Sequence, residues 1–104
     1  MAATDNLSVT VSDGDPVTLL VEGQIDTYTA VGFNDALVEL GGTQAIVVDL
    51  SQVTFIDSSG LRVLVRAEKR QAAGGGKLTI AQPSEAVARL LSITGLDTTL
   101  NIVT

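Results

Sequence analysis

The side chains best suited to chemistry in this sequence lie at Asp57-Ser58-Ser59, where a segment with helical spacing begins. Hydroxyl groups at such a position commonly cap the helix. They are also able to accept a phosphoryl group, which adds about 1.5 to 2 negative charges at pH 7. Free helix N–H groups would attract that charge and Asp57 would repel it. A partner packed on this turn would lose about 2 kcal/mol, or about 30-fold in affinity, so both a capping role and a switch fit these residues.

The rest of the sequence offers little for catalysis. It contains no histidine and no cysteine, which removes the Ser-His-Asp triad, the commonest general base and the usual zinc ligands. The segment Gly74-Gly75-Gly76-Lys77 resembles part of a phosphate-binding loop, but Leu78 stands where that loop needs Ser or Thr. We interpret the glycines as a helix stop, and we expect a protein that is not an enzyme and needs no cofactor.

Three aspartates lie near predicted strand ends, where α/β proteins often place their sites: Asp26, Asp49 and Asp57. Together they would suit an acidic metal pocket. A phospho-acceptor aspartate of the receiver type would need a pair of adjacent acids from an earlier loop, and no such pair precedes Asp49. Single aspartates at these positions more often cap helices. We therefore predict no metal site.

Length and composition indicate one folded domain over 1–104, with 1–6 flexible. The chain has 104 residues, of which 45% are hydrophobic and 17% charged, a balance that suits a single core. The net charge of −6 opposes binding to nucleic acid and to anionic membranes. The first residues lack a signal sequence, and no apolar run reaches the roughly 18 residues of a membrane span. We expect a cytoplasmic protein.

Basic residues are concentrated in one segment. Four of the six lie close together at helical spacing: Arg62, Arg66, Lys69 and Arg70. They predict a basic stripe opposite the apolar residues Leu61, Leu64 and Val65. Such a stripe is usually a solvated helix face that adds little stability. It is also able to steer a charged partner toward the protein.

The first part of the chain predicts a β-hairpin followed by a helix. Alternating residues form strands over 7–12 and 17–22, joined by a turn at 13–16 and closed by Gly23. Apolar residues at helical spacing predict a helix over 27–40, which Gly41-Gly42 stops.

The second part alternates strands and helices. The apolar run 45–48 predicts a central strand covered on both faces, and 50–56 a loop. A helix follows from the cap at 57–59 to the glycines at 74–76, with Leu61, Leu64, Val65 and Ala72 on its inner face. A strand over 78–81, a helix from Pro83-Ser84 to Gly95, and an optional strand over 100–103 complete the chain. The order β-β-α-β-α-β-α, with an optional last β, predicts an α/β fold with a mixed, mostly parallel sheet of four to five strands flanked by helices.

Several of these segments together resemble the STAS domain, the fold shared by sulfate transporters and anti-sigma-factor antagonists. Asp57-Ser58-Ser59-Gly60-Leu61 resembles the switch loop of the antagonists. The segment 23–26 with Thr29-Ala30 resembles the family's earlier turn, and 94–97 its Gly-Leu signature. The resemblance covers nearly the whole chain from about residue 7.

The resemblance implies a bacterial regulator that binds an anti-sigma factor, usually also a serine kinase, and so frees a sigma factor. The kinase would phosphorylate the second serine, Ser59, rather than Ser58, and phosphorylation would release the antagonist. A phosphoserine phosphatase is a further expected partner. The residues expected to bind the partner are Asp26, Thr27, Asp57, Ser58, Ser59, Gly60, Leu61, Arg62 and Arg66. The kinase would bring ATP and magnesium.

Two other functions fit the same residues. One is a STAS subunit that docks on a membrane transport ATPase complex without phosphorylation. The other is a module that senses a small ligand or nucleotide in the pocket at the strand ends.

Overall fold

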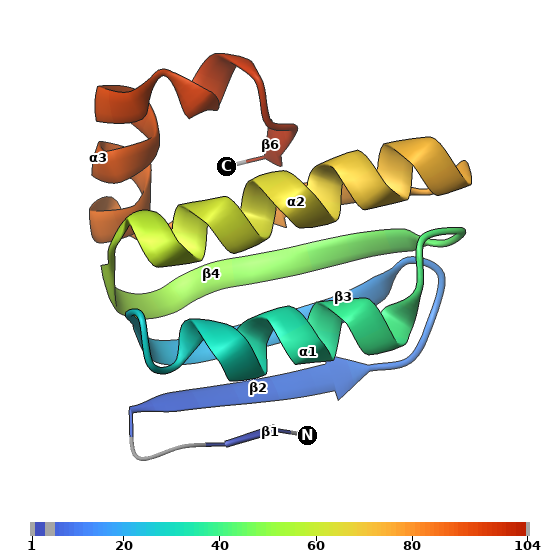
Figure 1. Ribbon diagram of the computed structural model, residues 1–104, viewed down its shortest axis with the longest axis horizontal. Helices are drawn as coiled ribbons and strands as arrows, with labels where there is room; N and C mark the ends of the chain where they lie inside the picture. Colours follow the sequence, from blue (N-terminus) through green and yellow to red (C-terminus); the bar gives the residue numbers. More distant parts are fainter. Residues whose placement is uncertain (1, 4–5, 104) are drawn as a thin grey trace.

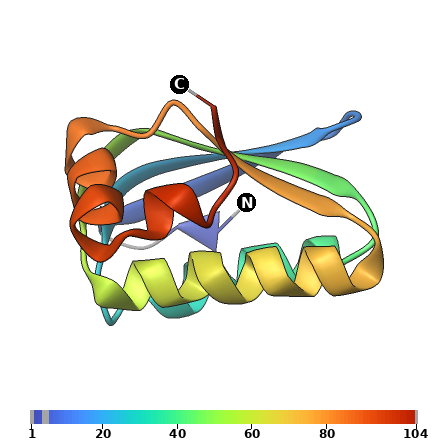
Figure 2. The same ribbon diagram turned by 90° about the horizontal axis from the view of Figure 1, so that it is seen from above.

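The structure, a computed structural model, describes residues 2–3 and 6–103. Its strands are β1 (Ala2–Ala3), β2 (Leu7–Ser12), β3 (Val17–Ile25), β4 (Ala45–Ile56), β5 (Lys77–Ala81) and β6 (Ile102–Val103). Its helices are α1 (Ala30–Leu40), α2 (Ser58–Gly74) and α3 (Glu85–Thr94), followed by the 3₁₀ turn η1 (Leu96–Thr98). Helices α1 and α2 lie side by side on one face of the sheet, and α3 lies at one end of it (Figures 1 and 2).

The sheet is mixed, as the sequence predicts. Its order is β1-β2-β3-β4-β5-β6. The β2–β3 hairpin is antiparallel, whereas β3–β4, β4–β5 and β5–β6 are parallel. The optional last strand is confirmed as β6, and β1 adds a sixth strand beside β2. The predicted flexibility of 1–6 falls partly on residues 1, 4 and 5, which lie outside the described residues.

The apolar side chains that alternate along the strands and those at helical spacing on α1 and α2 pack together in one core. In β2, Leu7 and Val9 are buried and Thr10 is exposed. In α1, Phe33 and Leu37 are buried on the side that faces the sheet. Such burial stabilises the fold by about 1.5 to 3 kcal/mol for each large apolar side chain. The core therefore fixes α1 and α2 against the same sheet face.

The later half of β4 corrects the predicted loop over 50–56. Residues 50–56 continue the strand because β3 also runs past Gly23 and pairs with β4 as far as Ile25 opposite Ile56. At two register shifts β4 advances one residue more than β3, which accommodates the extra length of β4. Gly23 therefore does not close the hairpin. Strands β3 and β4 end side by side, at Ile25 and Ile56.

The prediction that 45–48 is covered on both faces is also wrong. Ile46 and Val48 are buried, whereas Ala45 and Val47 are only half-buried. The physical reason is that α1 and α2 both cover the same face (Figure 2). The other face carries partly exposed side chains such as Thr18.

Two helix predictions need correction. Helix α1 begins at Ala30 rather than Thr27, because the preceding residues form a separate turn. On α2, Leu61 and Leu64 are buried as predicted, but Ala72 is exposed and Gln71 takes its place in the core. Successive residues turn by about 100° around a helix, so a stripe centred on Leu64 and Gln71 points Ala72 to solvent.

Candidate functional site

The turn between β3 and α1 is organised by Asp26. Its Oδ1 accepts hydrogen bonds from the backbone N–H groups of Tyr28, at 3.0 Å, and Thr29, at 2.9 Å. The bond from the Thr29 N–H is the main cause that holds the pKa of the Asp26 carboxyl below its ordinary value, with smaller contributions from the Thr29 hydroxyl and the Tyr28 N–H. Asp26 therefore shapes the turn from which Thr27 and Tyr28 project.

Thr29 completes this turn from inside. Its side chain is 0% exposed, and its hydroxyl accepts from the Asp26 N–H at 2.9 Å and donates to the Gln24 carbonyl at 2.8 Å. The sequence indicated Thr29 only as part of a motif, because a buried threonine and an exposed one look alike in a single sequence. Its burial means that it positions the turn and contacts no partner.

The beginning of α2 is capped by Asp57, as the sequence predicts. Its Oδ1 accepts from the Ser59 N–H at 2.8 Å, and its carbonyl accepts from the N–H groups of Gly60 and Leu61. Its own N–H donates to the Ile25 carbonyl at 3.1 Å, which ties α2 to the end of β3. The N–H groups of Ser59, Gly60 and Leu61 therefore already have acceptors, which narrows the expectation that free helix N–H groups attract a phosphate.

The two serines occupy different environments. Ser58 is exposed, whereas Ser59 is half-buried. The Ser59 hydroxyl lies 3.1 Å from the Thr27 hydroxyl, and either group is able to donate. The structure thus brings together two predicted site residues that lie far apart in the sequence. Neither serine is the N-cap, because Asp57 performs that role.

Two predicted partner-binding residues lie inside the protein instead. Leu61 is 4% exposed and belongs to the core. Gly60 is buried, and a Cβ there would lie 2.7 Å from Ile25 Cγ2 and 2.8 Å from Ile56 Cγ1. Helix α2 approaches the strand ends this closely only because residue 60 has no side chain. Gly60 and Leu61 therefore position Ser59 and do not form the surface.

A groove of about 250 Å³ separates α1 from α2 beside Ser59. Its walls include Thr27 and Asn34 on the α1 side, and Ser59, Arg62 and Arg66 on the α2 side. Most of the predicted site residues that are not buried therefore line this groove.

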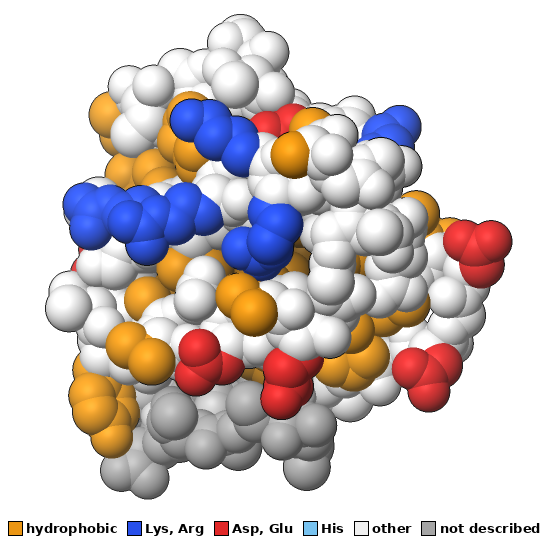
Figure 3. Space-filling view, turned by 45° about the vertical axis from the view of Figure 1, so that its right-hand side comes forward, with side chains coloured by type: hydrophobic (Ala, Val, Ile, Leu, Met, Phe, Trp, Pro, Cys, Tyr) orange, Lys and Arg blue, Asp and Glu red, His pale blue; other side chains and the backbone are white. Residues whose placement is uncertain are grey.

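The predicted basic stripe exists with one exception. Arg62, Arg66 and Lys69 are exposed on α2, and Figure 3 shows basic side chains at the level of this helix, with acidic ones below. Arg70 is half-buried against Gly42, with Nε and Nη2 buried and without a hydrogen-bond partner. It does not belong to the exposed stripe, because it points toward the loop after α1.

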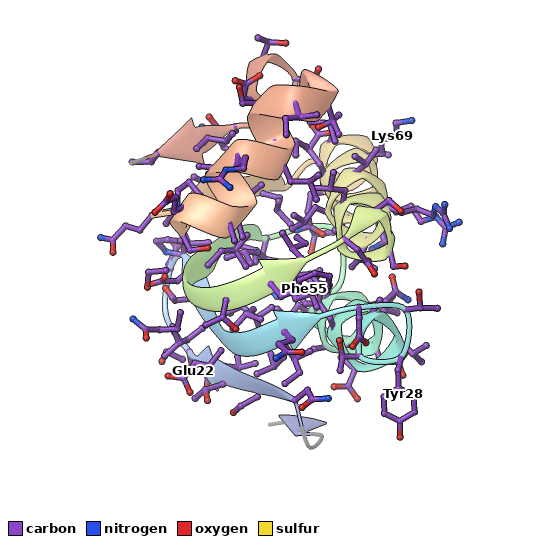
Figure 4. The ribbon with its side chains drawn as sticks, turned by 90° about the vertical axis from the view of Figure 1, so that its left-hand side faces the viewer. Glu22, Tyr28, Phe55 and Lys69 are labelled. Atoms are coloured by element: carbon purple, nitrogen blue, oxygen red, sulfur yellow. The ribbon has the colours of Figure 1, made fainter. Side chains whose placement is uncertain are left out.

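Exposed apolar side chains lie next to this site, and the sequence did not indicate them. Tyr28 is 78% exposed and Val31 is 64% exposed. Figure 4 shows Tyr28 projecting away from the body of the protein, on the α1 side, while Lys69 projects from α2. An apolar residue inside a predicted helix is normally expected to pack inward. Because α1 begins only at Ala30, Tyr28 lies in the preceding turn, outside the helix.

Among the described residues, no three acidic side chains come together as a metal site. Asp49 lies within β4 and accepts from the Ser51 N–H at 2.9 Å, so it acts locally, like Asp26 and Asp57. The glycines at 74–76 end α2 as predicted, with Gly75 in the left-handed conformation at φ 87°. None of the helices in 2–3 and 6–103 has the length and apolar character that crossing a membrane requires.

The chain matches the profile of the STAS domain over residues 6–104. It is 35% identical to the anti-sigma-B factor antagonist of Listeria monocytogenes over 101 residues, which cover 93% of this chain and 89% of that protein. It is 32% identical to the anti-sigma-F factor antagonist RsfB of Mycobacterium tuberculosis over 105 residues, covering 98% and 85% of the two chains.

Solved structures agree with this match. The crystal structure of an anti-sigma factor antagonist from Mycobacterium paratuberculosis superimposes with a TM-score of 0.85 at 29% identity, covering 99% of this chain and 90% of that one. The profile and the relatives, each matched over most of its length, lead to one conclusion. The chain belongs to the STAS domain family, and the relatives named above are anti-sigma factor antagonists.

Proposed function

We propose that this chain binds an anti-sigma factor that is also a serine kinase, and thereby frees a sigma factor. The names of the relatives from Listeria and Mycobacterium support the antagonist role, since both align over nearly the whole chain. The kinase and the switch are our own extension to this chain.

The position of the Ser59 hydroxyl is the observation that carries the proposal. It lies at the groove between α1 and α2, 3.1 Å from the Thr27 hydroxyl. Because the Asp57 carboxylate caps α2, the helix does not need the Ser59 hydroxyl. Ser59 is therefore free to be modified without loss of the helix.

The surface around Ser59 suits a protein partner. Tyr28 and Val31 offer exposed apolar area, and Arg62 and Arg66 offer charge beside it. Apolar anchors bordered by polar groups are typical of protein interfaces. A phosphate at this place would be partly desolvated by the partner and would weaken binding by about 2 kcal/mol, or about 30-fold.

The test is a kinase assay on matched variants. Wild type, Ser58→Ala and Ser59→Ala are incubated with the anti-sigma factor, ATP and magnesium, and the products are measured by intact-mass and peptide mass spectrometry. We expect one phosphate on wild type and on Ser58→Ala, and none on Ser59→Ala. A phosphate on Ser59→Ala would refute the assignment.

A second partner and a cellular location belong to the same proposal. A phosphoserine phosphatase would reverse the switch. Kinase, ATP and sigma factor all act in the cytoplasm, so we propose that this chain works there as well. The protein can also be isolated from growing and from stressed cells. If it carried no phosphate in either state and co-purified with membrane ATPase subunits, the transporter-docking function would replace this proposal.

A further inference from the structure

We infer that the groove between α1 and α2 is a built-in binding site for the phosphoryl group on Ser59, with Arg62 as its main cation and Arg66 as the second. This inference deepens the proposed function, because it concerns the modified form of the same serine. It assigns to two arginines a role inside the protein, in addition to any contact with a partner.

Helix α2 places both arginines on the same side as Ser59. Arg62 and Arg66 follow Ser59 by three and seven residues, so all three side chains lie on the same side of α2. All three also line the groove, together with Thr27. The Thr27 hydroxyl, 3.1 Å from the Ser59 oxygen, is placed to donate a hydrogen bond to a phosphoryl oxygen.

The electrostatics require a cation at this place. The N–H groups of Ser59, Gly60 and Leu61 already donate to Asp57, so they are not available to a phosphate. The Asp57 carboxylate lies close to Ser59, since it accepts from the Ser59 N–H at 2.8 Å. Its negative charge therefore repels a phosphate on Ser59. Asp26, next to Thr27, adds a second negative charge from the β3–α1 turn. The two exposed acids of α1, Asp35 and Glu39, do not line the groove.

Arg62 and Arg66 are available for this task. The ion pair recorded for the described part of the chain joins Arg89 to Glu85 on α3, and no such pair involves Arg62 or Arg66. A guanidinium group binds phosphate oxygens with two parallel hydrogen bonds, which is stronger and more directional than a lysine contact. Two arginines that pair with no acid among the described residues, beside one hydroxyl, therefore form a suitable site for a dianion.

The consequence is a switch with two parts. Phosphorylation adds negative charge at Ser59, and the phosphate then draws Arg62 into the groove. A partner would lose a cation from the exposed stripe as well as meet a new charge. The modified form would also gain an internal ion pair that the unmodified form lacks.

The experiment measures the phosphate itself. Full-length chain with phosphoserine incorporated at position 59 during translation is titrated by ³¹P NMR, alone and with Arg62→Gln or Lys69→Gln. A cation stabilises the dianion and so lowers its second pKa from the ordinary value of about 6. We expect Arg62→Gln to raise this pKa by about 0.5 to 1 unit. Lys69→Gln removes the same charge from farther along the same stripe of α2, outside the groove and about 15 Å along the helix from Ser59, and should raise the pKa by less than about 0.2 unit.

Equal shifts in the two variants, or no shift in Arg62→Gln, would overturn the inference. Thermal unfolding of each variant verifies that the fold is kept, which we expect because both side chains are exposed. The titration needs no kinase. If the kinase assay refuted Ser59 as the natural acceptor, the proposed function would fail while the groove's affinity for a phosphoryl group was still measured separately.

Discussion

Helices α2 and α3 begin in similar ways, yet only one of them forms a candidate switch. Each follows a strand or a short connection, and each has a serine in its first residues. At α3 the serine is itself the cap, since Ser84 Oγ accepts from the Val87 N–H at 3.3 Å. At α2 the cap is Asp57, and the Ser59 hydroxyl instead meets Thr27 of another element.

The two helices also differ in whether the arginine near the beginning has an acidic partner on the same helix. Arg89 on α3 pairs with Glu85 one turn earlier, at 3.1 Å. Arg62 on α2 has no acidic partner in its first turn, because that turn holds no acidic residue. A serine used as a cap beside a satisfied ion pair is a structural element. A serine behind a carboxylate cap, beside arginines that pair with no acid in the described part of the chain, is available for regulation.

The largest expected effect is on partner binding. Ser59→Asp should weaken binding to the anti-sigma factor by about 30-fold, because it places a charge where the partner packs. Ser84→Asp is the matched control at α3 and should leave affinity within about twofold, since aspartate also caps helices well. Isothermal titration calorimetry measures both. Equal losses in the two variants would show that general charge, and not the position of Ser59, controls binding.

The caps themselves should differ in stability. Asp57→Ala removes a 2.8 Å bond to the Ser59 N–H, and we expect the free energy of unfolding to fall by about 1.5 kcal/mol. Ser84→Ala removes a longer bond of 3.3 Å and should cost about 0.5 kcal/mol. Urea unfolding followed by circular dichroism gives both values. A larger loss at Ser84 would contradict the view that α2 depends on its carboxylate cap.

Close packing under α2 gives a smaller effect. Gly60→Ala places a Cβ 2.7 Å from Ile25 and 2.8 Å from Ile56. This overpacking should lower the free energy of unfolding by about 1 to 3 kcal/mol. The better helix propensity of alanine returns about 1 kcal/mol, so we expect a net loss of about 1 kcal/mol.

Gly32→Ala is the control for this substitution. Residue 32 also lies in a helix, but a Cβ there meets nothing within 4 Å. The protein should therefore gain about 0.5 to 1 kcal/mol, as measured by thermal or urea unfolding. If Gly60→Ala were also stabilising, residue 60 would not limit the approach of α2 to the strands.

The smallest expected effect concerns the turn beside the switch. Hydrogen bonds lower the pKa of Asp26 in the folded protein, so its carboxylate stabilises the fold above the unfolded pKa of about 3.9. This contribution disappears as the pH falls through the lowered value. Asp26→Asn should therefore flatten the acid end of the stability profile between about pH 2 and pH 5. An acid end that stays unchanged in Asp26→Asn would contradict the role of this carboxylate in the turn.

Features that depend on neighbours in sequence were predictable. Asp57 as a cap, the end of α2 at its glycines, and the start of α3 at Ser84 follow from short-range hydrogen bonds and from the φ values that glycine permits. The fold class follows from the alternation of strands and helices, and the resemblance to STAS domains follows from several segments together. The caps depend on residues within one or two turns of each other, and the fold class and the resemblance depend on the order of such local patterns along the chain.

Features that depend on distant segments were not predictable in the same way. The sequence predicts a loop over 50–56, but pairing with the extended end of β3 makes these residues a strand. Helical spacing predicts Arg70 in the basic stripe, but the packing of Gly42 against it turns it inward. The family resemblance predicts Leu61 at the partner surface, but the sheet below α2 buries it.

The residues that carry the chemistry can be named from their types and spacing alone: a capping aspartate, two serines, and a set of arginines at helical spacing. Tertiary structure decided what each of them meets. It placed Ser59 against Thr27 across a groove and withdrew Gly60 and Leu61 into the core. It left Arg62 and Arg66 beside the serine without an ion pair to any residue in 2–3 or 6–103. The physical reason is that capping and helical spacing are fixed by local backbone geometry, whereas burial and electrostatic environment arise only when segments far apart in the chain pack together.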